Sequence, residues 1–342
     1  MGNDRPAQFF ISAYTNFLSA AAKEECCFFY QLMGFTFSIR FASRVMAEKL
    51  KSAFSHLRVQ NGENSDLTIC VWDNVSTNTS PLTLPWDETA KQYRGEIPEY
   101  SDEKIFTLSD LHTKVLHVMD RERKIALYWI RDQSHLPWWI RGSPLQHILH
   151  WWMRTHRHQL THVAAVGYAK GGILLAGKGG SGKSTTTLAC MKAGMQYIGE
   201  DYCSISDTPN IWVHSVYSSA KLSEKTLFWF AELKKEIANP NRSPAEKALI
   251  FHHKFQPEKI LLSCPVKALI ALNIEEREKS FLEPIDPKEA LAPLSITTLW
   301  QLPHTGPDSF NHLKRIAYAL PCFKLHLGSD WMQTPKIIEG LL

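Results

Sequence analysis

Residues Gly177–Ser184 constrain this chain more than any other stretch, because they match the pattern G-x-x-x-x-G-K-[ST] at every fixed position. The apolar run 173–176 before them predicts a buried strand, and residues 185–192 predict a helix that Gly194 ends. Glycines in this position let backbone N–H groups turn around an anion, and the N-terminal end of the helix adds positive charge. The stretch therefore predicts a phosphate-binding loop (P-loop). The alternative is a plain glycine-rich turn.

The side chains of this loop predict which part of a nucleotide each would hold. Lys183, expected to be a solvated loop lysine, can reach the β- and γ-phosphates, and the Ser184 hydroxyl can ligate Mg²⁺. The residues expected to bind the nucleotide are Gly177, Lys178, Gly179, Gly180, Ser181, Gly182, Lys183, Ser184 and Thr185.

Two adjacent acids, Glu200 and Asp201, follow a short predicted strand at 196–198 and lie close behind the P-loop helix in sequence. Phosphoryl transfer requires a metal and also a group that accepts or orients the proton of the attacking hydroxyl. Neighbouring residues of an extended segment point to opposite faces, so one acid can meet the metal and the other the hydroxyl. The alternatives are a solvated turn and, for the metal, a weaker acidic candidate at Glu275.

Two further polar residues are candidates with an equally plain structural interpretation. His162 lies just before the predicted strand 163–166, where a histidine is more often structural than catalytic. Lys221 is either a second cation that faces the phosphates or a solvated lysine.

Composition limits the classes of protein that fit. The chain has 342 residues, enough for two domains, and its formal net charge of +4 gives no reason to expect a nucleic-acid partner. Seven scattered cysteines without C-x-x-C favour buried thiols in a reducing compartment over disulfides or zinc. Without a signal segment or an apolar run near membrane-spanning length, we expect a cytoplasmic protein with no membrane association.

Periodicity predicts two domains, a strand-rich α+β region at 1–142 that can take part in acceptor recognition and a P-loop domain at 143–342. Helices are expected at 9–22, 42–57, 223–237, 287–301, 308–320 and 335–342, with another beginning at Ser143-Pro144. Strands are expected at 35–41, 67–72, 114–119, 124–130, 202–206, 211–216, 266–272 and 322–327.

The run from His162 through Gly171–Gly177, Gly182-Lys183-Ser184 and Gly194 to Glu200-Asp201 resembles the bacterial HPr kinase/phosphorylase superfamily. In that family a histidine precedes the strand before the P-loop, and a glycine after the P-loop helix is followed six residues later by two aspartates. The resemblance is closer to the HPr kinase-related branch, whose members are often serine kinases. Some of them phosphorylate the C-terminal hydroxyl of a lasso-peptide precursor. It covers about residues 140–342.

The resemblance implies an α/β fold with a P-loop core of the HPr-kinase/PEP-carboxykinase type, a mixed sheet flanked by helices. It implies a kinase that uses ATP and Mg²⁺ and phosphorylates a Ser or Thr hydroxyl of a peptide or small protein. Lys183 and the loop would hold ATP, Ser184 and Asp201 would hold Mg²⁺, Glu200 would be the base, and His162 would lie near the transferred phosphate. A homo-oligomer is expected by the same analogy.

Two departures from the family pattern matter. Glu200 replaces the usual aspartate, which leaves open an exchange of roles with Asp201. The family's second signature, with its glycine and arginine, is not found, which argues against HPr as the acceptor and against phosphorylase activity. Two rival functions remain, a nucleotide-dependent switch or ATPase and a nucleotide-binding scaffold with a peptide-binding partner protein. The pair of adjacent acids favours the kinase.

Overall fold

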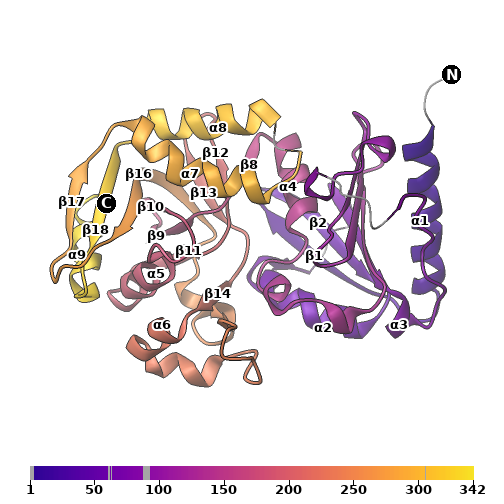
Figure 1. The fold of residues 1–342 in the computed structure, drawn as a ribbon, viewed down its shortest axis with the longest axis horizontal. Helices are drawn as coiled ribbons and strands as arrows, with labels where there is room; N and C mark the ends of the chain where they lie inside the picture. Colours follow the sequence, from indigo (N-terminus) through magenta and orange to yellow (C-terminus); the bar gives the residue numbers. More distant parts are fainter. Residues whose placement is uncertain (1–3, 61, 63, 88–92, 305) are drawn as a thin grey trace. The chain divides into compact units, whose positions relative to one another are not determined.

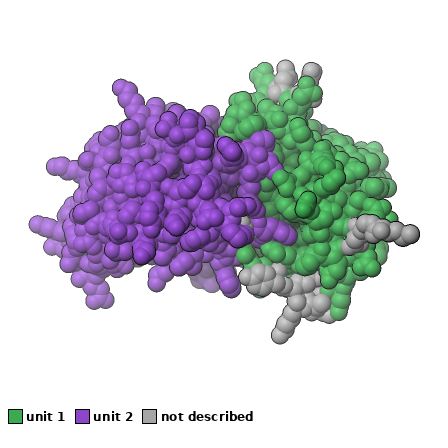
Figure 2. Space-filling model, turned by 90° about the horizontal axis from the view of Figure 1, so that it is seen from above, with its two compact units in different colours: residues 1–52, 57–152 green, residues 53–56, 153–342 purple. Residues whose placement is uncertain are grey.

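The computed structural model describes residues 4–60, 62, 64–87, 93–304 and 306–342 (Figure 1). The chain forms two compact units, one of residues 1–52 and 57–152 and the other of residues 53–56 and 153–342 (Figure 2). The division falls inside helix α4 (Gln146–Thr155), between Trp152 and Met153. In the described residues, no helix combines the length and the apolar character needed to cross a membrane.

Unit 1 is built on a seven-stranded mixed sheet in the order β3-β1-β2-β4-β7-β6-β5. The pairs β2·β4 and β4·β7 are parallel and the others antiparallel. Its strands are β1 (Cys26–Leu32), β2 (Phe35–Phe41), β3 (Arg58–Val59), β4 (Leu67–Asp73), β5 (Ile105–Ser109), β6 (Val115–Asp120) and β7 (Ile125–Ile130). Its helices are α1 (Arg5–Ala21), α2 (Arg44–Leu50) and α3 (Asn74–Thr77), with 3₁₀ turns at Lys51–Leu57, Tyr93–Gly95, Pro98–Tyr100, Gln133–His135 and Trp138–Arg141.

Most of the elements predicted for unit 1 are confirmed, and two helices differ. The predicted helix 42–57 is α2 followed by a 3₁₀ turn, Lys51–Leu57. The helix expected from Ser143-Pro144 begins only at Gln146, because Leu145 has a φ of 58°, a left-handed conformation that an α-helix cannot contain. Helix α1 buries Phe10 and Phe17 in a cluster that includes Trp72, and this apolar face fixes it to unit 1.

Unit 2 contains a nine-stranded mixed sheet in the order β11-β9-β10-β16-β13-β12-β8, with β18 also beside β16 and β17 beside β18. Strands β14 and β15 form a separate pair. The strands are β8 (His158–Thr161), β9 (Ala164–Tyr168), β10 (Gly171–Ala176), β11 (Gln196–Gly199), β12 (Cys203–Ser206), β13 (Trp212–Ser215), β14 (Ser219–Leu222), β15 (Ala248–Phe251), β16 (Ser263–Ile274), β17 (Phe281–Pro284) and β18 (Cys322–Leu327). The helices are α5 (Lys183–Lys192), α6 (Glu224–Trp229), α7 (Pro287–Gln301), α8 (Gly306–Ala319) and α9 (Thr334–Glu339), with 3₁₀ turns at Ala231–Glu236, His252–Lys254, Pro257–Lys259 and η9 (Trp331–Gln333).

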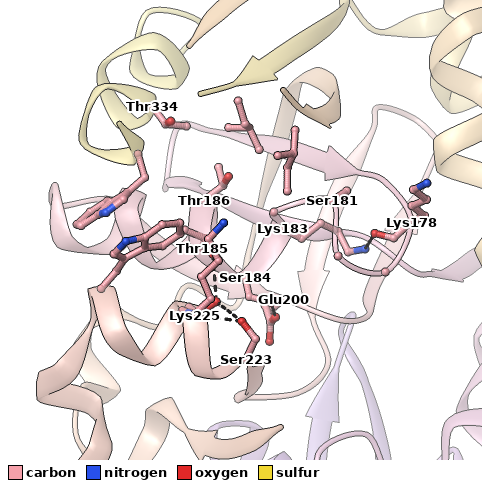
Figure 3. A pocket seen from close by; sticks show the side chains of 18 of the residues that line it. Lys178, Ser181, Lys183, Ser184, Thr185, Thr186, Glu200, Ser223, Lys225 and Thr334 are labelled. Atoms are coloured by element: carbon pink, nitrogen blue, oxygen red, sulfur yellow. Dashed lines mark hydrogen bonds between the residues drawn. The ribbon is translucent and has the colours of Figure 1, made fainter. Parts of the chain in front are cut away.

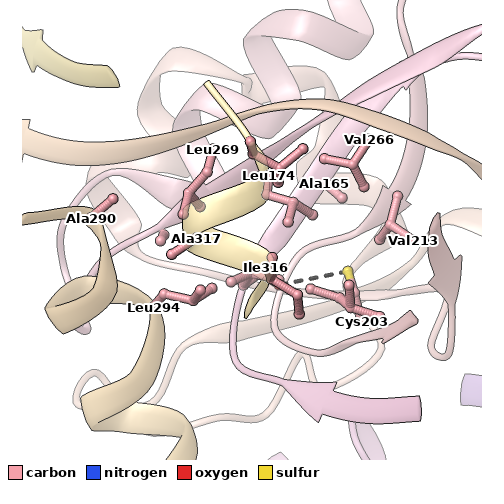
Figure 4. Packing of buried hydrophobic residues seen from close by; sticks show 14 of the residues in the cluster. Ala165, Leu174, Cys203, Val213, Val266, Leu269, Ala290, Leu294, Ile316 and Ala317 are labelled. Carbon is pink, nitrogen blue, oxygen red and sulfur yellow. Dashed lines mark hydrogen bonds between the residues drawn. The ribbon is translucent and has the colours of Figure 1, made fainter. Parts of the chain in front are cut away.

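Helices cover both faces of this sheet, as the side chains of β10 show. Leu174 and Ala176 pack in a cluster with residues of α7 and α8, including Leu294 and Ile316 (Figure 4). Ile173 and Leu175 point the other way, into a cluster that contains residues of α5 and α9. Since successive residues of a strand face opposite sides, a strand covered on both sides must be apolar throughout, which is the sequence of β10. The fold of unit 2 is therefore α/β.

The parallel strands at the centre of unit 2 determine where a site can form. Strand β16 runs parallel to β10 and to β18, so the carboxyl ends of all three meet at one edge of the sheet. Ligands of open α/β sheets bind in the crevice outside the carboxyl ends of parallel strands. The glycine-rich loop leaves β10 at this edge.

Candidate functional site

The loop 177–182 joins β10 to α5 and has a left-handed backbone at two glycines, Gly180 with a φ of 82° and Gly182 with a φ of 98°. A Cβ on Gly182 would also lie 2.6 Å from Leu327 Cδ1, and a Cβ on Gly177 would collide with the Ser181 side chain. No side chain caps the N-terminus of α5, and Ser181 Oγ is buried without a hydrogen-bond partner in the described residues. Both features fit a loop that receives an anion.

Lys183 is buried, with 8% of its surface exposed, so the expectation of a solvated loop lysine is wrong. Its ammonium donates to the carbonyl oxygens of Gly177, at 2.6 Å, and Lys178, at 3.4 Å. Burial lowers its pKa, and the charges of Asp201 and Glu200 oppose that shift only in part. Lys183 is thus held over the loop by two carbonyl groups that a phosphate could replace.

The Ser184 hydroxyl donates a hydrogen bond to the Glu200 carboxylate (Figure 3). The other oxygen of Glu200 accepts the backbone N–H of Lys221 at 2.9 Å. Glu200 is 6% exposed, and burial, with the neighbouring charge of Asp201, raises its pKa, while the two hydrogen bonds oppose the shift. A hydroxyl and a carboxylate oxygen therefore face each other at the first turn of α5.

Asp201 has different partners from its neighbour. Its Oδ1 lies 3.2 Å from His162 Nε2, and its Oδ2 lies 2.6 Å from Lys221 Nζ. Burial alone raises the pKa of Asp201, but the Lys221 ammonium and the bond from His162 outweigh it and hold the pKa well below its usual range. The two acids thus extend to different partners, as expected for neighbours on an extended segment, and Lys221 contacts both of them.

Residues of α7 and its neighbours hold His162 in position. Its backbone N–H donates to Thr298 Oγ1 at 2.9 Å, and its ring stacks on Tyr202 with centroids 5.2 Å apart. The Tyr202 hydroxyl in turn contacts Gln301. His162 Nδ1 is buried and has no hydrogen-bond partner in the described residues. Sequence analysis missed Tyr202, Thr298 and Gln301, because their contacts with each other and with His162 form only in the folded chain.

Lys183, Ser184 and Lys221 line one cavity of about 690 Å³, within the range of small-molecule sites, whereas Tyr202, Thr298 and Gln301 do not line it. Of the residues predicted to bind the nucleotide, Lys178 to Thr185 line it, and Gly177 does not. His162, Glu200 and Asp201 line it too, and so does the weaker candidate Glu275, which pairs with Arg277 at 3.1 Å. Sequence analysis gave no signal for four further lining residues, Lys225, Trp229, Lys247 and Trp331.

The donor set fits a magnesium ion that arrives with a nucleotide. In the described residues, no three His, Cys, Asp or Glu side chains gather in a way that could hold a metal ion on their own. Magnesium in nucleotide sites takes one or two protein ligands and completes its shell with phosphate oxygens and water. Ser184 and Glu200 supply one hydroxyl and one carboxylate, which matches that requirement.

No protein-family model and no curated protein matches this chain. Ninety-five chains of solved structures do match, among them the Hpr(Ser) kinase/phosphatase from Coxiella burnetii. It shares 13% sequence identity over 54% of this chain and 93% of that chain, with a TM-score of 0.29. Because this likeness is distant, the function proposed below rests on the residues of the site.

Proposed function

We propose that this protein is a kinase that uses ATP and Mg²⁺ to phosphorylate a Ser or Thr hydroxyl of a peptide or small protein. The observation that carries the proposal is the divided environment of the two acids, with Glu200 on the Ser184 hydroxyl and Asp201 between His162 and Lys221. A kinase requires a ligand for the metal and a second group that orients the acceptor hydroxyl, and the two acids can divide these roles. The glycine-rich loop at the carboxyl ends of parallel strands supports a P-loop core of the HPr-kinase/PEP-carboxykinase type.

The contacts of the acids favour roles exchanged from those that the family resemblance implies. Ser184 and Glu200 are the proposed side-chain ligands of the metal, because their oxygens face each other. Magnesium, when bound, neutralises charge on the transferred phosphate. Asp201 then accepts a hydrogen bond from the acceptor hydroxyl and takes its proton late in the transfer. Its low pKa suits this orienting role better than early proton removal.

The cations of the site have separate tasks in this scheme. Lys183 exchanges its two carbonyl partners for phosphate oxygens. Lys221 fixes the carboxylate of Asp201 through its ammonium and that of Glu200 through its backbone N–H. His162 holds the second oxygen of Asp201, so the orientation of this acid is set before an acceptor arrives.

A transfer assay tests the proposal. The full chain is incubated with γ-³²P-labelled ATP, Mg²⁺ and a mixture of peptides that carry Ser and Thr both internally and at the C-terminus. The proposal predicts label in peptide, and its loss in Asp201→Asn. Label in inorganic phosphate alone would support the ATPase, and unchanged ATP in the presence of measured nucleotide binding would support the scaffold.

A further inference from the structure

Trp229 and Trp331 line the cavity of the phosphate loop and have no part in the roles assigned so far. Trp229 is the last residue of α6, and Trp331 is the first of η9. Their ring centroids are 6.5 Å apart, with 36° between the ring planes. Both rings are half-buried and pack against a cluster that includes Leu222 and Phe230. Each indole is therefore held by the core on one side and borders the cavity on another.

The two tryptophans lie near the end of the loop 177–182 that leads into α5. Thr185, the residue after Ser184, has its hydroxyl oxygen 3.2 Å from that of Thr226, which lies one turn before Trp229 in α6. Thr334, three residues after Trp331, also lines the cavity. Figure 3 shows Thr185 and Thr334 on the side of the cavity opposite Lys178, with Ser184 between them. A ligand whose phosphates lie on the loop can thus extend past Ser184 toward the indoles.

Both indoles offer an aromatic surface at the wall of the cavity. A base that stacks on an indole would lie about 3.5–4.0 Å from its carbon atoms. The Lys225 ammonium lies over the Trp229 ring, 5.1 Å from its centroid, and the Lys192 ammonium lies over the Trp331 ring at 5.8 Å, so each indole has a cation beside it.

We infer that Trp229 and Trp331 form the base subsite of the nucleotide, with the base stacked on indole rings at the wall of the cavity. The inference rests on the proposed function. It identifies the residues that would bind the base of the donor, whereas the loop would bind its phosphates. The donor is then a nucleoside triphosphate rather than an inorganic polyphosphate. Stacking on aromatic rings supplies this recognition through the face of the base, which every nucleobase has.

Calorimetric titration of the full chain with two probes tests the inference. The probes are a non-hydrolysable ATP analogue and inorganic triphosphate, each with Mg²⁺. The variants are Trp229→Leu and Trp331→Leu, with Trp229→Phe as the conservative change. Trp300→Leu is the matched control, since Trp300 is 75% exposed on α7 and does not line the cavity. The thermal midpoint of each variant reports whether it is folded.

The inference predicts that each Leu variant binds the ATP analogue roughly 5- to 100-fold more weakly while its affinity for triphosphate stays within about two-fold. Trp229→Phe should retain most of the affinity, and Trp300→Leu all of it. Folded Leu variants that bind the ATP analogue like wild type would overturn the base subsite and leave the loop assignment intact. Equal losses for both probes would also overturn it, because they indicate packing. A wild type that binds neither probe would instead overturn the proposed function.

Discussion

His162 Nε2 lies 3.2 Å from Asp201 Oδ1, and this contact joins residues that lie on two different segments of unit 2. His162 precedes β9, and Asp201 follows β11, the strand paired with β9. With Lys221 Nζ at 2.6 Å on the other oxygen, both oxygens of Asp201 are fixed by protein groups. In the proposed scheme, an acid held in this way keeps one orientation toward a hydroxyl that enters the cavity.

Replacing Asp201 by asparagine should lower the rate of phosphoryl transfer. The amide keeps the volume and one acceptor oxygen but cannot take a proton, so we expect transfer to fall by roughly 10²–10⁴ while Mg²⁺·ATP affinity changes only a few-fold. Single-turnover transfer and calorimetric titration of the same variant separate the two effects. A large loss of Mg²⁺·ATP affinity in this variant would indicate that Asp201 is a metal ligand, as the family resemblance implies.

Replacing Glu200 by glutamine should stabilise the empty protein and weaken its metal site. The pKa of Glu200 is raised by folding, so its ionisation costs stability as the pH rises above the value of an unfolded glutamate, about 4.3. Glutamine avoids that cost, because its single oxygen can accept the Lys221 N–H while its amide N–H₂ donates to the Ser184 hydroxyl, which reverses the direction of that bond. We therefore expect Glu200→Gln to have the higher thermal midpoint at pH 7, with a difference that shrinks toward pH 4.

The same variant should gain less stability than wild type from Mg²⁺·ATP, because glutamine lacks the charge of a metal ligand. Thermal midpoints with and without Mg²⁺·ATP at pH 7 measure this gain. An equal gain in the two proteins would show that Glu200 does not hold the metal.

Replacing Gly182 by alanine should destabilise the folded protein and weaken nucleotide binding by the loop. The φ of 98° disfavours any side chain, and the new Cβ would meet Leu327 Cδ1 at 2.6 Å. We expect a loss of about 1–3 kcal/mol in the free energy of unfolding, measured by urea denaturation, together with weaker Mg²⁺·ATP binding. Gly179→Ala is the matched control, since a Cβ there has no atom within 4 Å and the φ of Gly179 is not left-handed. Equal stabilities of the two variants would contradict the strain assigned to Gly182.

Sequence alone predicted the parts of the site that depend on neighbouring residues. The order of strand, glycine loop, helix, strand and acids is present as β10, the loop, α5, β11 and Glu200-Asp201, because each element follows from its own periodicity. Strand β18 and helix α7 have the predicted bounds for the same reason. Five of the seven cysteines are buried and all seven are free, although Cys27 is exposed.

The parts that sequence could not predict depend on contacts between distant residues. Strands β14 and β15 are four residues each and are joined by 25 residues, 223–247, so no local pattern predicts their pairing. Lys221 lies on β14, and its contact with both acids follows from that placement. Trp229 and Trp331 meet only because α6 and η9 border the same cavity. Sequence analysis had left the role of Lys221 open, and the fold resolves its position.

In the proposed function the loop 177–184 holds the phosphates of a Mg²⁺-bound nucleotide, and the affinity of Lys183→Met for a non-hydrolysable ATP analogue with Mg²⁺ tests this. Methionine fills the buried volume of Lys183, and Lys170→Met is the matched control, because Lys170 is exposed and does not line the cavity. A charge-assisted hydrogen bond contributes about 1.5–3 kcal/mol, so we predict that folded Lys183→Met binds roughly 10- to 100-fold more weakly than wild type, while Lys170→Met binds equally well. A folded Lys183→Met protein with the affinity of wild type would rule out this role for the loop.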